Sequence, residues 1–215
     1  MIAAVIAAAL AAHGAPRPAP PPGWVDLREV APGVRFDIRY ATADNFTGAP
    51  LPGYAYPGAW LREAPAADLA AVHADLAPLG YGLLVYDAYR PLRATLAMVA
   101  WAERTGHVHL LDQGYVARRS NHNRGTTVDL TLVRLDTGEP VDMGVPWDTL
   151  DARAHTANAQ GEAARHRRIL VDAMRRRGFV NYSKEWWHFT WHPEESWAAS
   201  DVPYAPVVGD GSAKP

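Results

Sequence analysis

The sequence of 215 residues contains no cysteine. This absence excludes disulfide bonds, a thiol nucleophile and a lipoprotein anchor. Net charge is also nearly absent, with a formal value of −2, and there is no basic run beyond residues 175–177. That run suits the last turn of a helix, where cations interact favourably with the helix dipole. We therefore expect no nucleic-acid partner.

A hydrophobic run long enough to span a bilayer is also lacking. Residues 1–12 are nearly all alanine, valine, isoleucine and leucine, whereas a transmembrane helix needs about 20 apolar residues. The run fits the apolar region of a signal peptide, and the prolines of residues 16–22 would follow it as a stiff leader. We expect a periplasmic or secreted protein. Because a positively charged start is missing, a cytoplasmic location stays open.

The sequence does have enough apolar material for one domain. Hydrophobic residues make up 48% of the chain, and no internal repeat is visible. We assign residues 1–22 to a signal peptide with its proline-rich leader, and residues 23–215 to a single domain. The oligomeric state is left open, because exposed apolar patches cannot be located without coordinates.

An imidazole and a carboxylate, His122 and Asp129, stand seven residues apart. A straight helix would separate them by roughly 10 Å along its axis, too far for one metal ion with bonds of about 2 Å. The chain must bend between them, and Gly125 has the conformational freedom to do so. Val128 and Leu130 alternate with Asp129 as in a strand, which would direct the carboxylate away from the apolar face.

A second imidazole and carboxylate, Glu185 and His188, lie far along the chain. Three protein ligands and an open position are typical of catalytic zinc, so we expect His122, Asp129 and His188 to bind one Zn²⁺ per chain. Glu185 then remains free as general base and acid. In a regular strand Glu185 and His188 would point to opposite faces, so their spacing alone leaves open whether both reach the metal.

Five motifs stand in order along the chain. They are Asp37-Ile38-Arg39-Tyr40-Ala41-Thr42-x-Asp44-Asn45-Phe46-Thr47-Gly48, residues 80–91, Ser120-x-His122-x-Arg124-Gly125-x3-Asp129-Leu130-Thr131-Leu132, residues 134–139 and Glu185-Trp186-Trp187-His188. Together they resemble the D-alanyl-D-alanine dipeptidases of the vancomycin-resistance type. The likeness runs from about Trp24 to about Val202 and keeps the order of the motifs.

The resemblance implies a zinc peptidase of cell-wall peptides that hydrolyses the D-Ala-D-Ala dipeptide, with Glu185 and Arg90 catalytic. Arg90 matches an active-site arginine that would stabilise the oxyanion, although by spacing alone an ion pair with Asp87 or Glu103 is the simpler interpretation. Asp148 resembles the acid that faces the substrate ammonium. The positions matching the family's substrate pocket are Tyr40, Tyr54 and Ser120.

Departures from the family pattern concern substrate choice. Asn121 and Asn123 replace serines, Thr127 replaces a small apolar residue, and residues 105–113 look shorter than in the resistance enzymes. A shorter rim would admit longer peptides, so a peptidoglycan D,D- or L,D-carboxypeptidase or an endopeptidase is an alternative. A zinc-stabilised, non-catalytic peptidoglycan-binding module is a further one, although it would need neither Glu185 nor Arg90.

The remaining periodicity predicts an α+β fold, with zinc in a cleft on a central antiparallel sheet flanked by helices. We expect helices over residues 65–79, 93–104 and 160–177, the second with Leu96, Val99 and Ala100 inward. A buried strand is expected over residues 82–86 and a hairpin over 128–141. His107 and His109 would share one side of a strand, but no third ligand is close in the sequence.

Overall fold

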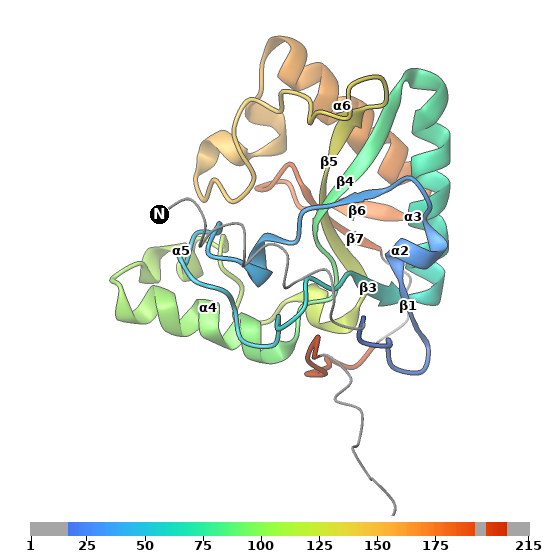
Figure 1. Ribbon diagram of the computed structural model, residues 1–215. Helices are drawn as coiled ribbons and strands as arrows, with labels where there is room; N and C mark the ends of the chain where they lie inside the picture. The colour runs from blue at the N-terminus through green and yellow to red at the C-terminus, as the bar shows by residue number, and fades with distance from the viewer. Residues whose placement is uncertain (1–16, 192–196, 206–215) are drawn as a thin grey trace, which may run out of the picture.

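A five-stranded sheet positions the rest of the chain in the computed structural model, which describes residues 17–191 and 197–205 (Figure 1). The strand order is β2-β4-β5-β7-β6. The strands are β2 (Arg35–Phe36), β4 (Tyr81–Asp87), β5 (Thr127–Arg134), β6 (Phe179–Asn181) and β7 (His188–Trp191). A separate antiparallel pair joins β1 (Trp24–Asp26) to β3 (Trp60–Arg62).

The sheet is mixed, so the expectation of a central antiparallel sheet is met only in part. β4, β5, β7 and β6 pair antiparallel in turn, but the edge strand β2 pairs parallel with β4. The chain leaves β2, passes through β3 and α3 (Glu63–Leu76), and only then enters β4. A parallel neighbour needs such a long crossover, which short-range alternation cannot reveal.

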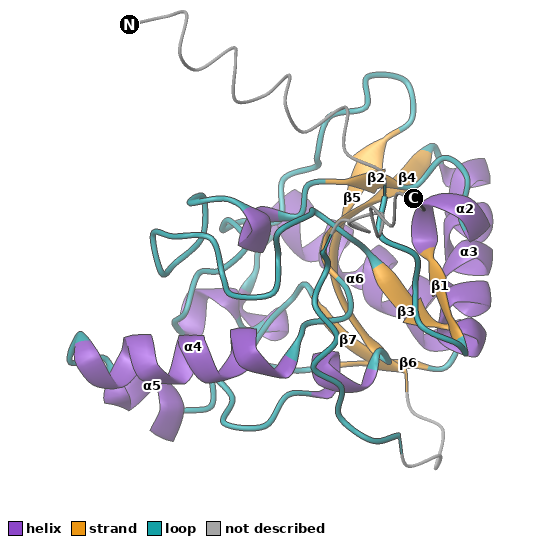
Figure 2. Cartoon of the chain, turned by 60° about the horizontal axis from the view of Figure 1, so that its bottom comes forward, coloured by secondary structure: helices purple, strands orange, loops and turns teal. Residues whose placement is uncertain are grey.

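Five α-helices accompany the sheet in the described part of the chain. Besides α3 they are α2 (Leu27–Val30), α4 (Leu92–Arg104), α5 (Val108–Asp112) and α6 (Gly161–Arg176). α3 packs against α6 and β4, whereas α4 packs with α5 on the other side of the molecule (Figure 2). The single-domain α+β arrangement with a helix-flanked sheet is therefore confirmed.

The three long predicted helices are present, and glycines end two of them as expected. After α3 and a short 3₁₀ turn (Ala77–Leu79), Gly80 adopts φ 80°, and after α6 Gly178 adopts φ 79°. Such left-handed positions carry little steric cost for glycine. Leu69, Val72 and Leu76 form the buried face of α3.

The inward face of α4 was predicted only in part. Val99 is half-buried and packs against the core, but Leu96 is 55% exposed and Ala100 is exposed. The buried residues of this helix are Ala94, Thr95, Met98 and Ala102. Thr95 accepts a hydrogen bond from Asn123 Nδ2 at 2.9 Å, and Met98 Sδ lies 3.6 Å from Arg90 Nη1. Polar contacts with the neighbouring loop thus fix the rotation of this helix, and a hydrophobicity pattern does not contain them.

The predicted hairpin over residues 128–141 is only half regular. β5 forms its first arm, but the return arm makes a single bridge, between Val133 and Pro140. Proline has no backbone N–H to donate and therefore interrupts a strand ladder.

The segment from Ser200 to Tyr204 forms hydrogen bonds with several loops around the sheet. Tyr204 is fully buried; its hydroxyl donates to Tyr89 O at 2.8 Å and accepts from Trp60 N at 3.2 Å. Ser200 N donates to Asn123 O at 2.8 Å. Because Tyr89 and Asn123 are the sequence neighbours of Arg90 and His122, this segment supports both.

The expected signal peptide lies mostly outside the described residues, so it stays a prediction. Within residues 17–191 and 197–205, none of the helices combines the length and the apolar character needed to cross a bilayer.

Replacing Tyr204 with phenylalanine keeps the ring but leaves a buried carbonyl and a buried N–H without their partner. We expect Tyr204→Phe to lower the free energy of unfolding by about 1–3 kcal/mol, measured by urea denaturation. Tyr56→Phe is the matched control, because the half-buried Tyr56 hydroxyl makes no hydrogen bond to a described residue. Equal stability of the two variants would contradict the role given to the Tyr204 hydroxyl.

Candidate metal centre and active site

A tight turn brings His122 and Asp129 together. His122 lies in a 3₁₀ turn (Asn121–Arg124) whose first free N–H groups are capped by Ser120, with Oγ accepting from His122 N at 3.3 Å. Gly125 ends the turn with φ 73°, and β5 begins two residues later. A Cβ atom at position 125 would also collide with the Trp24 ring. The predicted bend at Gly125 is therefore confirmed.

Strand pairing places His188 beside Asp129. The two residues are directly opposite each other in the antiparallel register of β5 and β7. Glu185 is not in the strand, because the chain turns just before it: Glu185 N donates to Tyr182 O at 2.9 Å and His188 N donates to Glu185 O at 3.3 Å. This turn resolves the objection that Glu185 and His188 would face opposite ways, since Glu185 Oε2 lies 3.6 Å from His188 Nδ1.

Three donor atoms converge at this point. His122 Nε2 lies 3.2 Å from Asp129 Oδ1 and 3.3 Å from His188 Nδ1, and His188 Nδ1 lies 3.0 Å from Asp129 Oδ1. A tetrahedral ion with bonds of about 2.0–2.1 Å separates its ligand atoms by about 3.3 Å. The triangle therefore has nearly the dimensions of one face of a tetrahedral metal site. Among the described residues, these three form the set of His and acidic side chains whose ligand atoms lie close enough together to bind one metal ion.

The protonation of His122 also favours a cation. Its Nδ1 lies 2.6 Å from Ala88 O, a carbonyl that can only accept, so Nδ1 carries the proton. In the neutral ring, Nε2 then directs a lone pair toward the buried Asp129 carboxylate. Two lone pairs facing each other repel unless a positive charge lies between them. A metal ion satisfies both, and the Ala88 bond holds the ring in the tautomer that can ligate.

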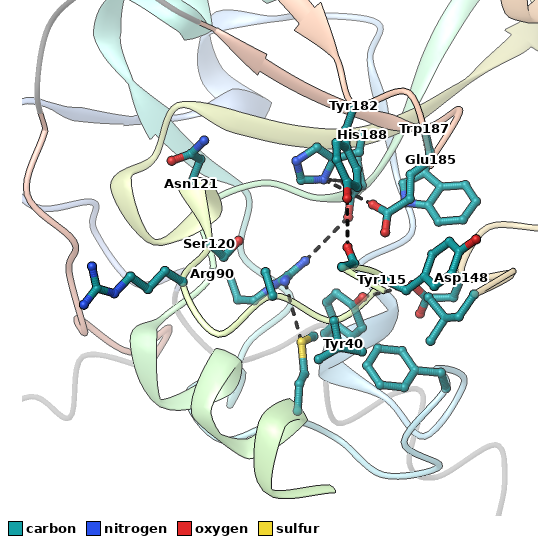
Figure 3. Close-up of a pocket in the computed structure, with 18 residues that line it drawn as sticks. Tyr40, Arg90, Tyr115, Ser120, Asn121, Asp148, Tyr182, Glu185, Trp187 and His188 are labelled. Carbon is teal, nitrogen blue, oxygen red and sulfur yellow. Dashed lines mark hydrogen bonds and ion pairs between the residues drawn. The ribbon is translucent and has the colours of Figure 1, made fainter. Parts of the chain in front are cut away.

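Glu185 stands beside this triangle as a buried carboxylate, 7% exposed. Burial raises its pKa well above the usual range, Asp129 raises it further by repulsion, and Arg90 opposes the shift. Glu185 and His188 lie together at one wall of the cavity, with Trp187 next to them (Figure 3). A carboxyl group with a raised pKa next to a metal site is suited to proton transfer near neutral pH.

Arg90 is buried, 8% exposed, and is held by two carboxylates. Its Nε and Nη2 each lie 2.9 Å from Asp87 Oδ2, and Nη2 lies 3.5 Å from Asp129 Oδ2. The alternative partner Glu103 pairs instead with Arg118, at 3.1 Å. Arg90 thus makes the Asp87 ion pair and also lines the cavity, so the two interpretations of this residue are compatible.

A cavity of about 310 Å³ opens in front of the donor triangle. Asp129, Glu185 and His188 line it together with Arg90 and three of the predicted substrate-binding residues, Tyr40, Ser120 and Asp148. Ser120 and Asn121 lie on one side of Arg90, and Tyr40 with Asp148 on the other (Figure 3). The cavity therefore has two polar ends separated by the metal triangle and Arg90.

Asp148 is the polar group of the second end. Its backbone is left-handed, with φ 61°, a conformation that aspartate tolerates better than most residues. Tyr40 donates to Oδ1 at 3.0 Å, while Oδ2 is buried and has no hydrogen-bond partner among the described residues. Burial, with a further contribution from Asp129, raises the pKa of Asp148 well above its usual range. A buried acceptor without a partner is a site for a ligand that donates hydrogen bonds.

Comparison with known proteins identifies the family. The profile of the peptidase family M15, described as D-ala-D-ala dipeptidase, matches residues 22–205. The chain belongs to this family.

Several relatives support the same membership. D-alanyl-D-alanine dipeptidase of Enterococcus faecalis is 42% identical over 182 residues, covering 78% of this chain and 90% of that protein. The Streptomyces coelicolor and Escherichia coli proteins of the same name are 39% and 36% identical, covering 75% and 77% of this chain and 88% and 82% of their own lengths. Membership makes the chain a metallopeptidase.

Tyr54 lies apart from the other three predicted substrate-binding residues. The resemblance places it in the substrate pocket, but it is not among the residues that line the cavity. Tyr54 is 4% exposed, and its hydroxyl donates to Asp87 Oδ1 at 2.6 Å. The fully buried Asp87 carboxylate draws this hydroxyl inward, so Tyr54 supports Arg90 through Asp87 and does not face the substrate space.

Asp87 is a site residue that the sequence did not reveal. From the sequence it was considered only as a possible ion-pair partner of Arg90. A register shift between Val85 and Asp87 in the β4–β5 pairing places Asp87 opposite Asp129. Such bulges commonly redirect a side chain next to an active site. An acid at the end of a buried strand, three residues before the arginine, was the available signal.

The His107 and His109 pair does not resemble the donor triangle. Both lie at the start of a helix and not on the strand considered from the sequence, and His107 stacks on Trp101 with ring centroids 4.8 Å apart. His107 Nδ1 also lies 2.8 Å from Thr105 Oγ1.

The two histidine sets predict different outcomes for metal binding. We expect wild-type protein to bind one equivalent of divalent metal. His122→Ala should lose stoichiometric binding, because it leaves only two of the three protein ligands. His109→Ala is the control and should retain it. The measurement is metal content after equilibrium dialysis, and full metal content in His122→Ala would contradict the assignment of the triangle.

Proposed function

We propose that this peptidase uses one Zn²⁺ held by His122, Asp129 and His188 to hydrolyse the D-Ala-D-Ala dipeptide to two molecules of D-alanine. The observation that carries the proposal is the donor triangle with Glu185 beside it, at the bottom of a small cavity. Two imidazoles, one carboxylate and an open position suit catalytic zinc. The choice of D-Ala-D-Ala as substrate follows from the relatives named D-alanyl-D-alanine dipeptidase.

Zinc, when bound, would polarise the scissile carbonyl and make a bound water more acidic. Glu185 accepts the proton of the attacking water and delivers it to the leaving amine. Its carboxylate lies next to the metal site, because Oε2 is only 3.6 Å from Nδ1 of His188, the nitrogen that would bind the metal. Its burial lets it hold a proton between the two steps, since a desolvated carboxyl group is a weaker acid.

Arg90 stabilises the negative charge that develops on the carbonyl oxygen. Its guanidinium is fixed in advance by the bonds of Nε and Nη2 to Asp87, and Tyr54 fixes Asp87 in turn. A preorganised charge of this kind needs no rearrangement when the oxyanion forms, which is where such groups contribute most. Water exclusion by the buried surroundings strengthens the interaction.

Asp148 and Tyr40 bind the free ammonium of the substrate. Oδ2 of Asp148 offers a buried acceptor without a partner, which an ammonium group would satisfy with a charge-assisted hydrogen bond. The cavity of about 310 Å³ has room for a small ligand such as a dipeptide. The ammonium site favours a dipeptide over a longer stem peptide, because the corresponding nitrogen of a stem peptide is acylated and carries no charge.

Glutamine at position 185 keeps the shape of the side chain but cannot take up a proton. We expect Glu185→Gln to reduce kcat by at least about 10³-fold while zinc stays bound at one equivalent. Turnover is measured as released D-alanine, and zinc by elemental analysis. Loss of stoichiometric zinc in this variant would make Glu185 a ligand and overturn its assigned role.

A panel of three substrates separates the dipeptidase from its alternatives. We expect release of alanine from D-Ala-D-Ala, and none from L-Ala-L-Ala or from an N-acylated stem peptide ending in D-Ala-D-Ala. Cleavage of the acylated peptide would instead favour the carboxypeptidase, and inactivity on all three would favour the binding module.

The ammonium site has its own test. Asp148→Asn removes the charge at nearly constant volume and should raise KM for D-Ala-D-Ala by about 10- to 100-fold, because the charge-assisted bond is lost. Zinc content is the control for correct folding. An unchanged KM would remove Asp148 from the substrate site.

A further inference from the structure

The charges around the cavity leave one requirement of the proposed substrate unmet. Asp129, Asp148 and Glu185 line the cavity with Arg90, and Asp87 lies behind it as the partner of Arg90. When all four carboxyl groups are ionised, a divalent metal ion and the substrate ammonium would balance the negative charge that Arg90 leaves. The substrate carboxylate adds another negative charge, and repulsion in a site of low dielectric constant makes that unfavourable without a further cation.

Arg90 cannot readily serve the carboxylate as well. Its Nε and Nη2 are occupied by Asp87, Nη2 also lies 3.5 Å from Asp129, and Nη1 lies against Met98 Sδ at 3.6 Å. Its remaining hydrogen-bonding capacity is needed at the carbonyl that is attacked.

Arg119 is the other arginine that lines the cavity. Its side chain is exposed, and within the described residues it has no acidic partner within 4.0 Å. Its neighbour Arg118 is also exposed but pairs with Glu103 at 3.1 Å and does not line the cavity. The two adjacent arginines therefore differ. Arg119 lines the cavity and has no acidic partner among the described residues, whereas Arg118 is paired and does not line the cavity.

The position of Arg119 fits the far end of a dipeptide. Arg119 directly precedes Ser120, and Ser120 lies on the opposite side of Arg90 from Asp148 (Figure 3). A substrate whose ammonium binds Asp148 and whose peptide bond lies at the metal triangle extends its carboxylate toward this end. Guanidinium and carboxylate can form two parallel hydrogen bonds. The guanidinium group is weakly hydrated, so forming this pair costs it little free energy of hydration.

We propose that Arg119 binds the free carboxylate of the substrate and makes the enzyme selective for peptides with an unmodified C-terminus. This rests on the proposed function, because the direction of the substrate follows from the ammonium at Asp148. Together, Asp148 and Arg119 read the two charged ends of a dipeptide. Specificity then requires both ends to be free.

The test compares D-Ala-D-Ala with D-Ala-D-alaninamide, which lacks the carboxylate, using the zinc-loaded full chain. Wild type should prefer the free dipeptide. Arg119→Gln should lower kcat/KM for D-Ala-D-Ala about 10- to 100-fold, mainly through KM. The same substitution should change kcat/KM for D-Ala-D-alaninamide by less than about twofold. Arg118→Gln is the matched control and should change neither. An equal loss on both substrates, or no loss on either, would overturn the proposal.

A binding measurement separates this proposal from the proposed function. In the Glu185→Gln background, calorimetry with D-Ala-D-Ala reports binding without turnover. Weaker binding on adding Arg119→Gln, with the amide unaffected, supports the carboxylate contact even if the wild type fails to hydrolyse the dipeptide. Unchanged binding of D-Ala-D-Ala overturns the contact, even in an active enzyme.

Discussion

The pairing of β5 with β7 at Asp129 and His188 is the constraint on which the site depends. It places a carboxylate and an imidazole opposite each other across two strands, with Nδ1 and Oδ1 3.0 Å apart. The turn ended by Gly125 then brings His122 to the same carboxylate oxygen. A rigid sheet is a suitable base for a metal site, because small displacements of a ligand weaken coordination. Backbone hydrogen bonds of the sheet and of the turn thus position all three ligands.

Charge organises the surroundings of this triangle. Asp87 and Asp129 face each other across the β4–β5 pairing, and Arg90 contacts both. Two buried carboxylates so close together are unfavourable unless a cation lies with them. Arg90 therefore stabilises the site while its guanidinium is held ready for the substrate. Support comes from outside the cavity: Tyr54 donates to Asp87, and Tyr204 and Ser200 bond to the neighbours of Arg90 and His122.

Local patterns in the sequence were sufficient for the long helices, the buried strand β4 and the bend at Gly125. They were insufficient where a distant partner decides. The rotation of α4 is set by Asn123 and Arg90, the parallel edge strand β2 by a crossover, and the direction of the Tyr54 side chain by Asp87. The donor triangle could be named from spacing and resemblance, but its geometry comes from a strand register that no local motif records. Asp87 was missed because a bulge, not an alternation, directs it.

Crystal diffraction from zinc-loaded protein at the zinc absorption edge tests the central claim most directly, because anomalous scattering locates the metal without assumptions about its ligands. The account predicts one strong peak per chain, at bonding distance of about 2.0–2.2 Å from His122 Nε2, Asp129 Oδ1 and His188 Nδ1, with Glu185 outside the coordination sphere. A peak elsewhere, or one coordinated by Glu185 in place of any of these three, would contradict it.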